Sequence, residues 1–147
     1  MRKFAIPLVL VLASCGPIPD LRPAPQRPVI DEDTGLEVPG SDARTVEDFD
    51  TTSAADREAA TSTSGGGSRL GTTVASLGDA GAPGFWLETP LVSAPTTGRV
   101  RNPDTGRTVQ VDLRPISGGS SRISLAALRL LEAPLTELVT LEVFLNS

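Results

Sequence analysis

Histidine and tyrosine are absent from this chain of 147 residues, and cysteine occurs only once. Without histidine the chain lacks the commonest general base, the commonest metal ligand and every catalytic triad that depends on an imidazole. A single cysteine excludes an internal disulfide and a thiolate metal cluster. We therefore expect no metal site, no bound cofactor and no catalytic residue of these kinds, and the position of Cys15 has to explain its presence.

Aromatic side chains are scarce, because the chain has four phenylalanines and one tryptophan. Glycine and proline are plentiful, with 14 and 13 residues, and apolar residues make up 39 % of the chain, a little below the usual globular share. These numbers allow one domain, with a small core built mainly from leucine, valine and alanine.

Residues 1–14 form a predicted signal peptide. Arg2 and Lys3 supply its positive charge, and the apolar run at 4–13 is too short to span a bilayer as a helix. The run ends in Leu12-Ala13-Ser14-Cys15, which resembles the bacterial lipobox. That resemblance implies cleavage before Cys15, a diacylglyceryl group on its thiol and a fatty acid such as palmitate on its new amine. The alternative is an ordinary signal peptide with an incidental cysteine.

The lipid on Cys15 would make the membrane the first partner of this chain, since several acyl chains hold a protein firmly. Gly16 follows the cysteine where such lipoproteins that stay in the inner membrane carry aspartate. The resemblance therefore implies an outer-membrane anchor with the rest of the chain facing the periplasm.

The segment at 15–68 reads as a disordered, acidic tether. Between residues 16 and 68 there are six prolines, and eleven acids stand against four arginines, a net charge of −7. Low hydrophobicity with high net charge does not repay the entropy of folding. A short helix over 54–60 fits the pattern but is too short to persist alone, and the glycines at 65–67 predict a flexible joint.

The remaining residues, 69–147, are the candidate folded domain. Their seven acids and seven arginines balance, so there is no electrostatic case for nucleic acid as a partner. Strands are expected at 71–77, 85–92, 99–102, 107–113 and 138–145, with a hairpin turn at 103–106. A helix over 125–131 is expected to begin at the cap Ser124 and to stop at Pro134. The fold class predicted is mainly β, a small barrel with one short helix.

Four pieces of this domain form a recognisable pattern: Gly98-Arg99-Val100-Arg101-Asn102, Gly106-Arg107-Thr108-Val109-Gln110-Val111, Arg114 and Arg122-Ile123-Ser124-Leu125. This pattern resembles rare lipoprotein A, a family of outer-membrane lipoproteins with a double-psi β barrel. It implies a double-psi-like barrel and peptidoglycan as a partner, and some members of the family cleave bare glycan strands.

The positions that carry acids in that family are changed here. Leu113 stands where the family has the acid of its Asn-Asp-Arg-Gly-Pro motif, and Ser124 stands where it has an aspartate before the helix. Glycan cleavage needs two carboxylates across the scissile bond, and only Asp112 and Glu88 are loosely placed for this. We expect a non-catalytic domain that meets the cell wall or another envelope protein. A glycan-cleaving enzyme and a structural lipoprotein without a ligand remain alternatives.

Three residues are candidates for contacting a ligand: Trp86, Asp112 and Arg114. Tryptophan suits stacking on a sugar, and arginine suits bidentate binding of a carboxylate or phosphate; for Trp86 the alternative is the main aromatic anchor of a small core. Residues 75–92 and 121–131 are also similar to short lipoproteins labelled galactarate dehydratase-like. The chain has no histidine and no cysteine besides Cys15, and residues 69–147 have no clustered carboxylates, all of which such a metal-dependent dehydratase would draw on.

Overall fold

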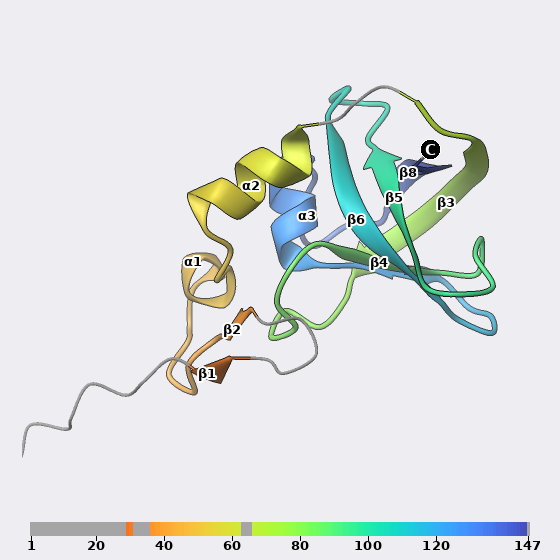
Figure 1. Ribbon diagram of the computed structural model, residues 1–147. Coiled ribbons are helices and arrows are strands. Elements are labelled where there is room, and N and C mark those ends of the chain that lie inside the picture. The colour runs from red at the N-terminus through yellow and green to blue at the C-terminus, as the bar shows by residue number, and fades with distance from the viewer. Residues whose placement is uncertain (1–28, 31–35, 63–65, 147) are drawn as a thin grey trace, which may run out of the picture.

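Six strands close into a barrel in the computed structural model, which describes residues 29–30, 36–62 and 66–146 (Figure 1). The predicted signal peptide and Cys15 lie outside the described residues. Around the barrel the strands follow the order β3-β7-β4-β6-β5-β8. Their bounds are β3 (Arg69–Leu77), β4 (Trp86–Thr89), β5 (Thr96–Arg101), β6 (Thr108–Pro115), β7 (Ser121–Ile123) and β8 (Val139–Leu145), and the helix α3 (Leu125–Leu130) lies between the last two strands.

The barrel has an internal twofold pattern that makes it double-psi-like. Exchanging β3 with β6, β4 with β7 and β5 with β8 leaves every neighbour in the barrel unchanged. Two pairs are parallel, β3 with β7 and β4 with β6, and the exchange turns one pair into the other. Each half of the domain therefore leaves a gap that a strand of the other half fills, and the predicted fold class is confirmed.

The hairpin that joins β5 to β6 is the most local part of the barrel. Its turn is held by the Asn102 N–H, which donates to the Arg107 carbonyl at 2.9 Å, and the Gly106 N–H, which donates to the Asn102 carbonyl at 2.8 Å. Gly106 has a φ of 73°, a conformation that glycine adopts without strain. The predicted turn at 103–106 is confirmed.

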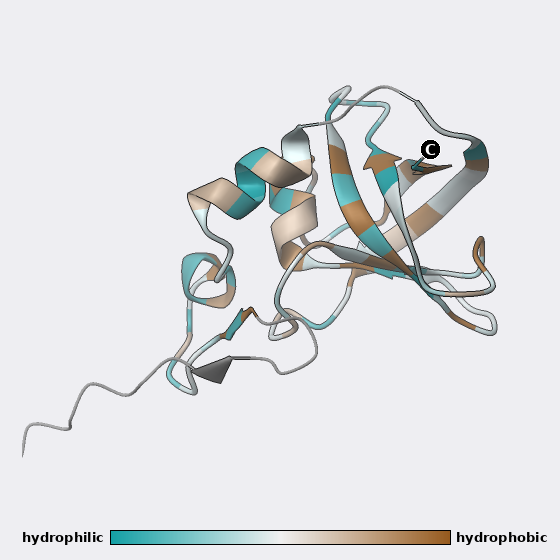
Figure 2. Cartoon of the chain, viewed as in Figure 1, coloured by the Kyte–Doolittle hydropathy of each residue, from teal (hydrophilic) through white to brown (hydrophobic). Residues whose placement is uncertain are grey.

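Alternation along β6 fixes which side chains fill the barrel. Val109, Val111 and Leu113 are buried while the residues between them face outward, as the period of two predicts. Figure 2 shows this as alternating brown and teal bands along β6. The same alternation in the other strands completes the core, which consists mainly of Ala75, Leu87, Val100, Ile123, Leu141 and Val143.

Helix α3 covers one side of this core with Leu128 and its C-cap residue Leu131, both fully buried. The predicted cap is confirmed, because the Ser124 hydroxyl accepts from the Ala127 N–H at 3.3 Å. The helix ends differently from the prediction. Glu132 adopts a φ of 51°, and the Ala133 N–H donates to the Leu128 carbonyl at 3.1 Å. This is a Schellman ending, so the helix stops before Pro134 is reached.

Ser124 also ties α3 to β4, because its hydroxyl accepts from the Trp86 N–H at 3.2 Å inside the protein. Replacing Ser124 by alanine is expected to lower the free energy of unfolding by about 2 kcal/mol, since the change leaves a buried backbone N–H without a partner and removes the helix cap. Chemical denaturation of the purified variant measures this loss. A loss below about 0.5 kcal/mol would show that water replaces the hydroxyl at little cost.

Residues 36–62 pack against the barrel, and here the prediction of a tether up to residue 68 is wrong. This segment contains β2 (Glu37–Val38), which pairs with β1 (Val29–Ile30), and the helices α1 (Val46–Phe49) and α2 (Ala54–Thr61). Helix α2 packs against β6 (Figure 1), and Ala60 joins the core cluster. Ala60 is the one buried residue of α2, and Asp56 and Arg57 are half-buried, so this packing leaves little trace in a hydropathy pattern.

A carboxylate at the foot of α2 anchors this segment to the barrel. The Asp50 side chain is only 4 % exposed, and its Oδ2 lies 2.7 Å from Nη1 of Arg129, which extends from α3. Arg57 Nη2 lies 3.7 Å from the same oxygen, and the Thr52 backbone N–H donates to Oδ1 at 3.2 Å. A buried charge is stable only when it is paired and hydrogen-bonded, so these contacts fix α1 and α2 to α3.

Candidate functional site

Three strands of the barrel align polar and aromatic side chains on their outer surface. Leu87 and Thr89 of β4 are buried inside the barrel, so their neighbour Trp86 points outward. Trp86 is in register with Asp112 of β6, and Asp112 is in register with Thr97 of β5. The next outward row starts at Arg114, which is in register with Glu88 of β4. The three predicted ligand contacts therefore lie on one surface.

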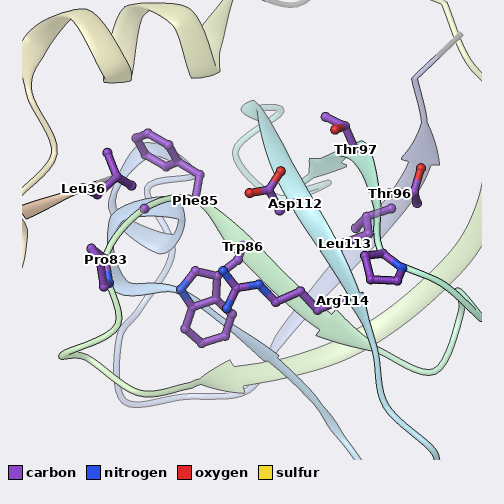
Figure 3. A pocket seen from close by; sticks show the side chains of 11 residues that line it. Leu36, Pro83, Phe85, Trp86, Thr96, Thr97, Asp112, Leu113 and Arg114 are labelled. Carbon is purple, nitrogen blue, oxygen red and sulfur yellow. The ribbon is translucent and has the colours of Figure 1, made fainter. Parts of the chain in front are cut away.

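A pocket of about 560 Å³ opens on this surface (Figure 3). The loop before β4, the start of β5 and the end of β6 form its walls, and its rim includes a residue of the segment at 36–62. The described residues that line it are Leu36, Pro83, Gly84, Phe85, Trp86, Pro95, Thr96, Thr97, Asp112, Leu113 and Arg114. The pocket thus combines apolar walls with one cation, one carboxylate and two hydroxyls, the usual make-up of a small-molecule site.

Trp86 forms the floor of this pocket and is not an open stacking surface. It is only 3 % exposed. The loop at 78–84 covers the ring, since a methyl group placed on Gly78 would lie 2.4 Å from the indole, and the indole N–H donates to the Ala82 carbonyl at 3.3 Å. These contacts fit the alternative role of Trp86 as an aromatic anchor, and they leave Phe85, which is half-buried, as the accessible aromatic ring in the pocket.

Arg114 lies over the floor of the pocket. Its guanidinium carbon is 5.3 Å from the centre of the Trp86 ring, a cation–π contact that holds the planar group in one orientation. No carboxylate among the described residues forms an ion pair with it, because the adjacent Glu88 bonds to Arg122 of β7 at 2.9 Å. The five N–H donors of Arg114 are therefore oriented by stacking and remain available to an anion.

The structure does not pair Asp112 with Glu88, the two carboxylates considered for glycan cleavage. Asp112 lines the pocket and is exposed, whereas Glu88 is held by Arg122 and is not among the described residues of the lining. The two other positions that differ from rare lipoprotein A are buried: Leu113 fills the barrel, and Ser124 caps α3. Asp112 is thus the single carboxylate among the described residues of this pocket.

A second, smaller pocket of about 240 Å³ adjoins the first beneath α2. The two share Leu36, Phe85, Thr97 and Asp112, so they form one groove, which we call the α2 groove. Asp56 of α2 lines the far end and is bound to Ser53 through the backbone N–H at 2.9 Å and the hydroxyl at 2.6 Å. The groove therefore has a cationic end at Arg114 and an acidic end at Asp112 and Asp56.

The hydrogen bonds from Ser53, first from its hydroxyl and then from its backbone N–H, lower the pKa of Asp56 below its usual 3.8. A carboxylate with a lowered pKa stabilises the folded state above the unfolded-state pKa, and this contribution is lost as the pH falls through the lower folded-state value. We expect the amide hydrogens of α2 to lose protection from exchange as the pH falls below about 4. In an Asp56→Asn variant we expect the protection of α2 to change less with pH. Equal pH profiles of protection for the two proteins would contradict the role given to Asp56.

Sequence reasoning found three of the lining residues and missed the others. Thr96, Thr97 and Leu36 carry no signal in the sequence, because a threonine at a strand start and a leucine in an acidic segment are common surface patterns. Their role follows from the register of β5 on β6 and from the packing of residues 36–62.

Within the described residues no group of three or more histidine, cysteine, aspartate or glutamate side chains is placed to hold a metal ion. None of the helices described is long and apolar enough to cross a membrane. Comparison of the chain with protein-family models, with curated proteins and with solved structures finds no match.

Proposed function

We propose that this chain is a lipid-anchored envelope protein whose barrel binds a cell-wall or envelope-protein partner without cleaving it. The observation that carries the binding role is the pocket above Trp86, where an oriented cation, a carboxylate and apolar walls converge. The position of Glu88 supports the non-catalytic role. Glu88 bonds to Arg122 and does not join Asp112, the single carboxylate among the described residues of the pocket.

The anchoring part of the proposal rests on the sequence from Arg2 to Gly16. In it the lipid on Cys15 holds the chain in the outer membrane, and residues up to about 35 connect the anchor to the folded part in the periplasm. Labelled palmitate supplied to growing cells that produce the chain tests this directly. The full chain is expected to become labelled, and a Cys15→Ser variant is expected to remain unlabelled. An intact thiol with residues 1–14 still attached, detected by mass spectrometry, would overturn the anchor.

The binding part is tested with the full chain in detergent and purified peptidoglycan sacculi. The protein is expected to sediment with the sacculi and to release no soluble glycan fragments. Released fragments would favour the glycan-cleaving alternative suggested by the resemblance to rare lipoprotein A. Absence of binding to sacculi, together with no envelope protein captured by crosslinking in intact cells, would favour a structural lipoprotein without a ligand.

A further inference from the structure

The α2 groove carries charges of opposite sign within a short span. Asp112 and Arg114 are two residues apart on one face of β6, which separates their α-carbons by about 6.6 Å. Arg114 stacks on Trp86, and Trp86 is in register with Asp112. The guanidinium is therefore turned back toward the row of Asp112, so both charged groups face the same volume of the pocket (Figure 3).

Each of these two groups has unused bonding capacity toward the pocket. Arg114 makes a cation–π contact and forms no ion pair with a described carboxylate, and the Asp112 side chain, which is exposed, forms no hydrogen bond or ion pair with a described residue. A guanidinium fork binds a carboxylate through two parallel hydrogen bonds, and a carboxylate binds an ammonium group. A simple anion would meet repulsion from Asp112, and a simple cation would meet repulsion from Arg114. A ligand that carries both charges avoids both penalties.

The walls and size of the pocket limit the rest of the ligand. Phe85, Pro83, Pro95 and Leu36 provide apolar surface, while Thr96 and Thr97 provide hydroxyls at the edge. A volume of about 560 Å³ is in the range of small-molecule sites. An extended dipeptide places its terminal ammonium about 6 Å from its carboxylate carbon, which is comparable to the Cα separation of Asp112 and Arg114. Trp86 is only 3 % exposed, so its own ring offers no open face for a sugar.

We propose that the α2 groove binds a dipeptide with a free N-terminal ammonium and a free C-terminal carboxylate, with the carboxylate on Arg114 and the ammonium on Asp112. This names the ligand class for the binding site above and so rests on the proposed function only in taking the barrel to be a binding module. The pair of opposite charges distinguishes such a peptide from bare glycan.

Trp86 is the single tryptophan of the chain, so its fluorescence reports on the pocket floor directly. The experiment titrates the full chain in detergent with alanyl-alanine, with its N-acetyl derivative, with its C-terminal amide and with chitotriose. We expect alanyl-alanine to change the emission in a saturable way, and we expect either blocked peptide to bind at least tenfold more weakly. Equal binding of the free and blocked dipeptides, or a response to chitotriose alone, would overturn the ligand class.

Variants assign the two charges, with calorimetry as the readout because some of them change the fluorescence itself. Arg114→Gln is expected to abolish binding of the dipeptide. Arg114→Lys, which keeps a positive charge, replaces the glutamine variant if that variant fails to fold. It is expected to bind the dipeptide several-fold more weakly than the unaltered chain does, because the guanidinium fork is lost. With Asp112→Asn we expect the free and the N-acetylated dipeptide to bind equally well, while the C-terminal amide still binds more weakly than the free dipeptide. Arg107→Gln, a change on the hairpin outside the groove, is the matched control and is expected to bind as the unaltered chain does.

Failure of this inference is distinguishable from failure of the proposed function. If the chain sediments with sacculi and no dipeptide binds, the ligand class is wrong and the binding role stands. If the dipeptide binds as expected and sacculi do not retain the chain, the pocket is assigned correctly and the partner is not the cell wall. Unchanged dipeptide binding by Arg114→Gln would place the ligand elsewhere and overturn the assignment of the groove.

Discussion

Gly98→Ala is expected to lower the free energy of unfolding by about 3 kcal/mol, at the upper end of the usual range for overpacking a barrel interior. Gly98 lies in β5 between Val111 of β6 and Leu145 of β8. An alanine methyl group there would lie 2.4 Å from Cδ1 of Leu113 and 2.5 Å from the carbonyl oxygen of Phe144. The leucine can change its rotamer, but the carbonyl belongs to the backbone of β8 and can move only if the seam between β5 and β8 opens.

Urea denaturation of Gly98→Ala and of a matched variant, Gly81→Ala, measures this effect. Gly81 lies in the loop before β4, and a methyl group on it would come no closer than 3.3 Å to the side chain of Asp79. We expect the control to change stability by less than about 0.5 kcal/mol, as surface substitutions usually do. If the two variants were equally stable, the close contact across the seam would be relieved by a movement that the barrel tolerates.

Arg129→Met is expected to release the segment at 36–62 from the barrel and to leave the barrel folded. The change removes the cation that lies 2.7 Å from the Asp50 carboxylate, whose side chain is 4 % exposed. Loss of one partner of a fully buried ion pair costs about 3–5 kcal/mol. Arg129 is itself 33 % exposed and Arg57 remains nearby, so we expect the docking of the segment to weaken by about 2 kcal/mol. Because the segment can unfold locally, we expect it to detach while the barrel keeps its stability.

Limited proteolysis and amide exchange test this expectation. We expect faster cleavage between residues 36 and 62 and lower protection of α2, while the thermal midpoint of the barrel remains nearly constant. Arg107→Met is the control, because its partner Glu132 is 58 % exposed and such surface pairs contribute little. If the barrel lost as much free energy of unfolding as the amide protection of α2 indicates for the segment, the segment and the barrel would unfold together.

The parts of the fold that depend on local sequence were predictable. The turn at 103–106, the buried face of β6 and the cap Ser124 all follow from short-range patterns, and the structure confirms them. The sequence predicts no strand at β7. β7 spans only Ser121–Ile123, and it is a strand because β3 and β4 lie on either side of it. Pairing partners so distant in the chain leave no local pattern.

The site was predictable only in part, for a related reason. Trp86, Asp112 and Arg114 were recognisable as residues suited to a ligand, but the parallel pairing of β4 with β6 is what places them together. The docking of residues 36–62 was not predictable from hydropathy. It depends on one buried carboxylate and on small residues such as Ala43 and Ala60, in a stretch whose composition is otherwise that of a linker.

The exchange of strands between the two halves of the barrel has a consequence for how the chain reaches its folded state. A nascent chain that ends after β5 leaves β3 and β4 with no β7 between them, so its strands have unpaired edges and an uncovered interior. Stable intermediates along the chain are therefore few, and the last seam closes late, in a step that joins residues more than 70 positions apart, such as Arg69 and Phe144. Chains with such distant pairings fold slowly, so we expect this barrel to stay incompletely closed for an extended interval after synthesis.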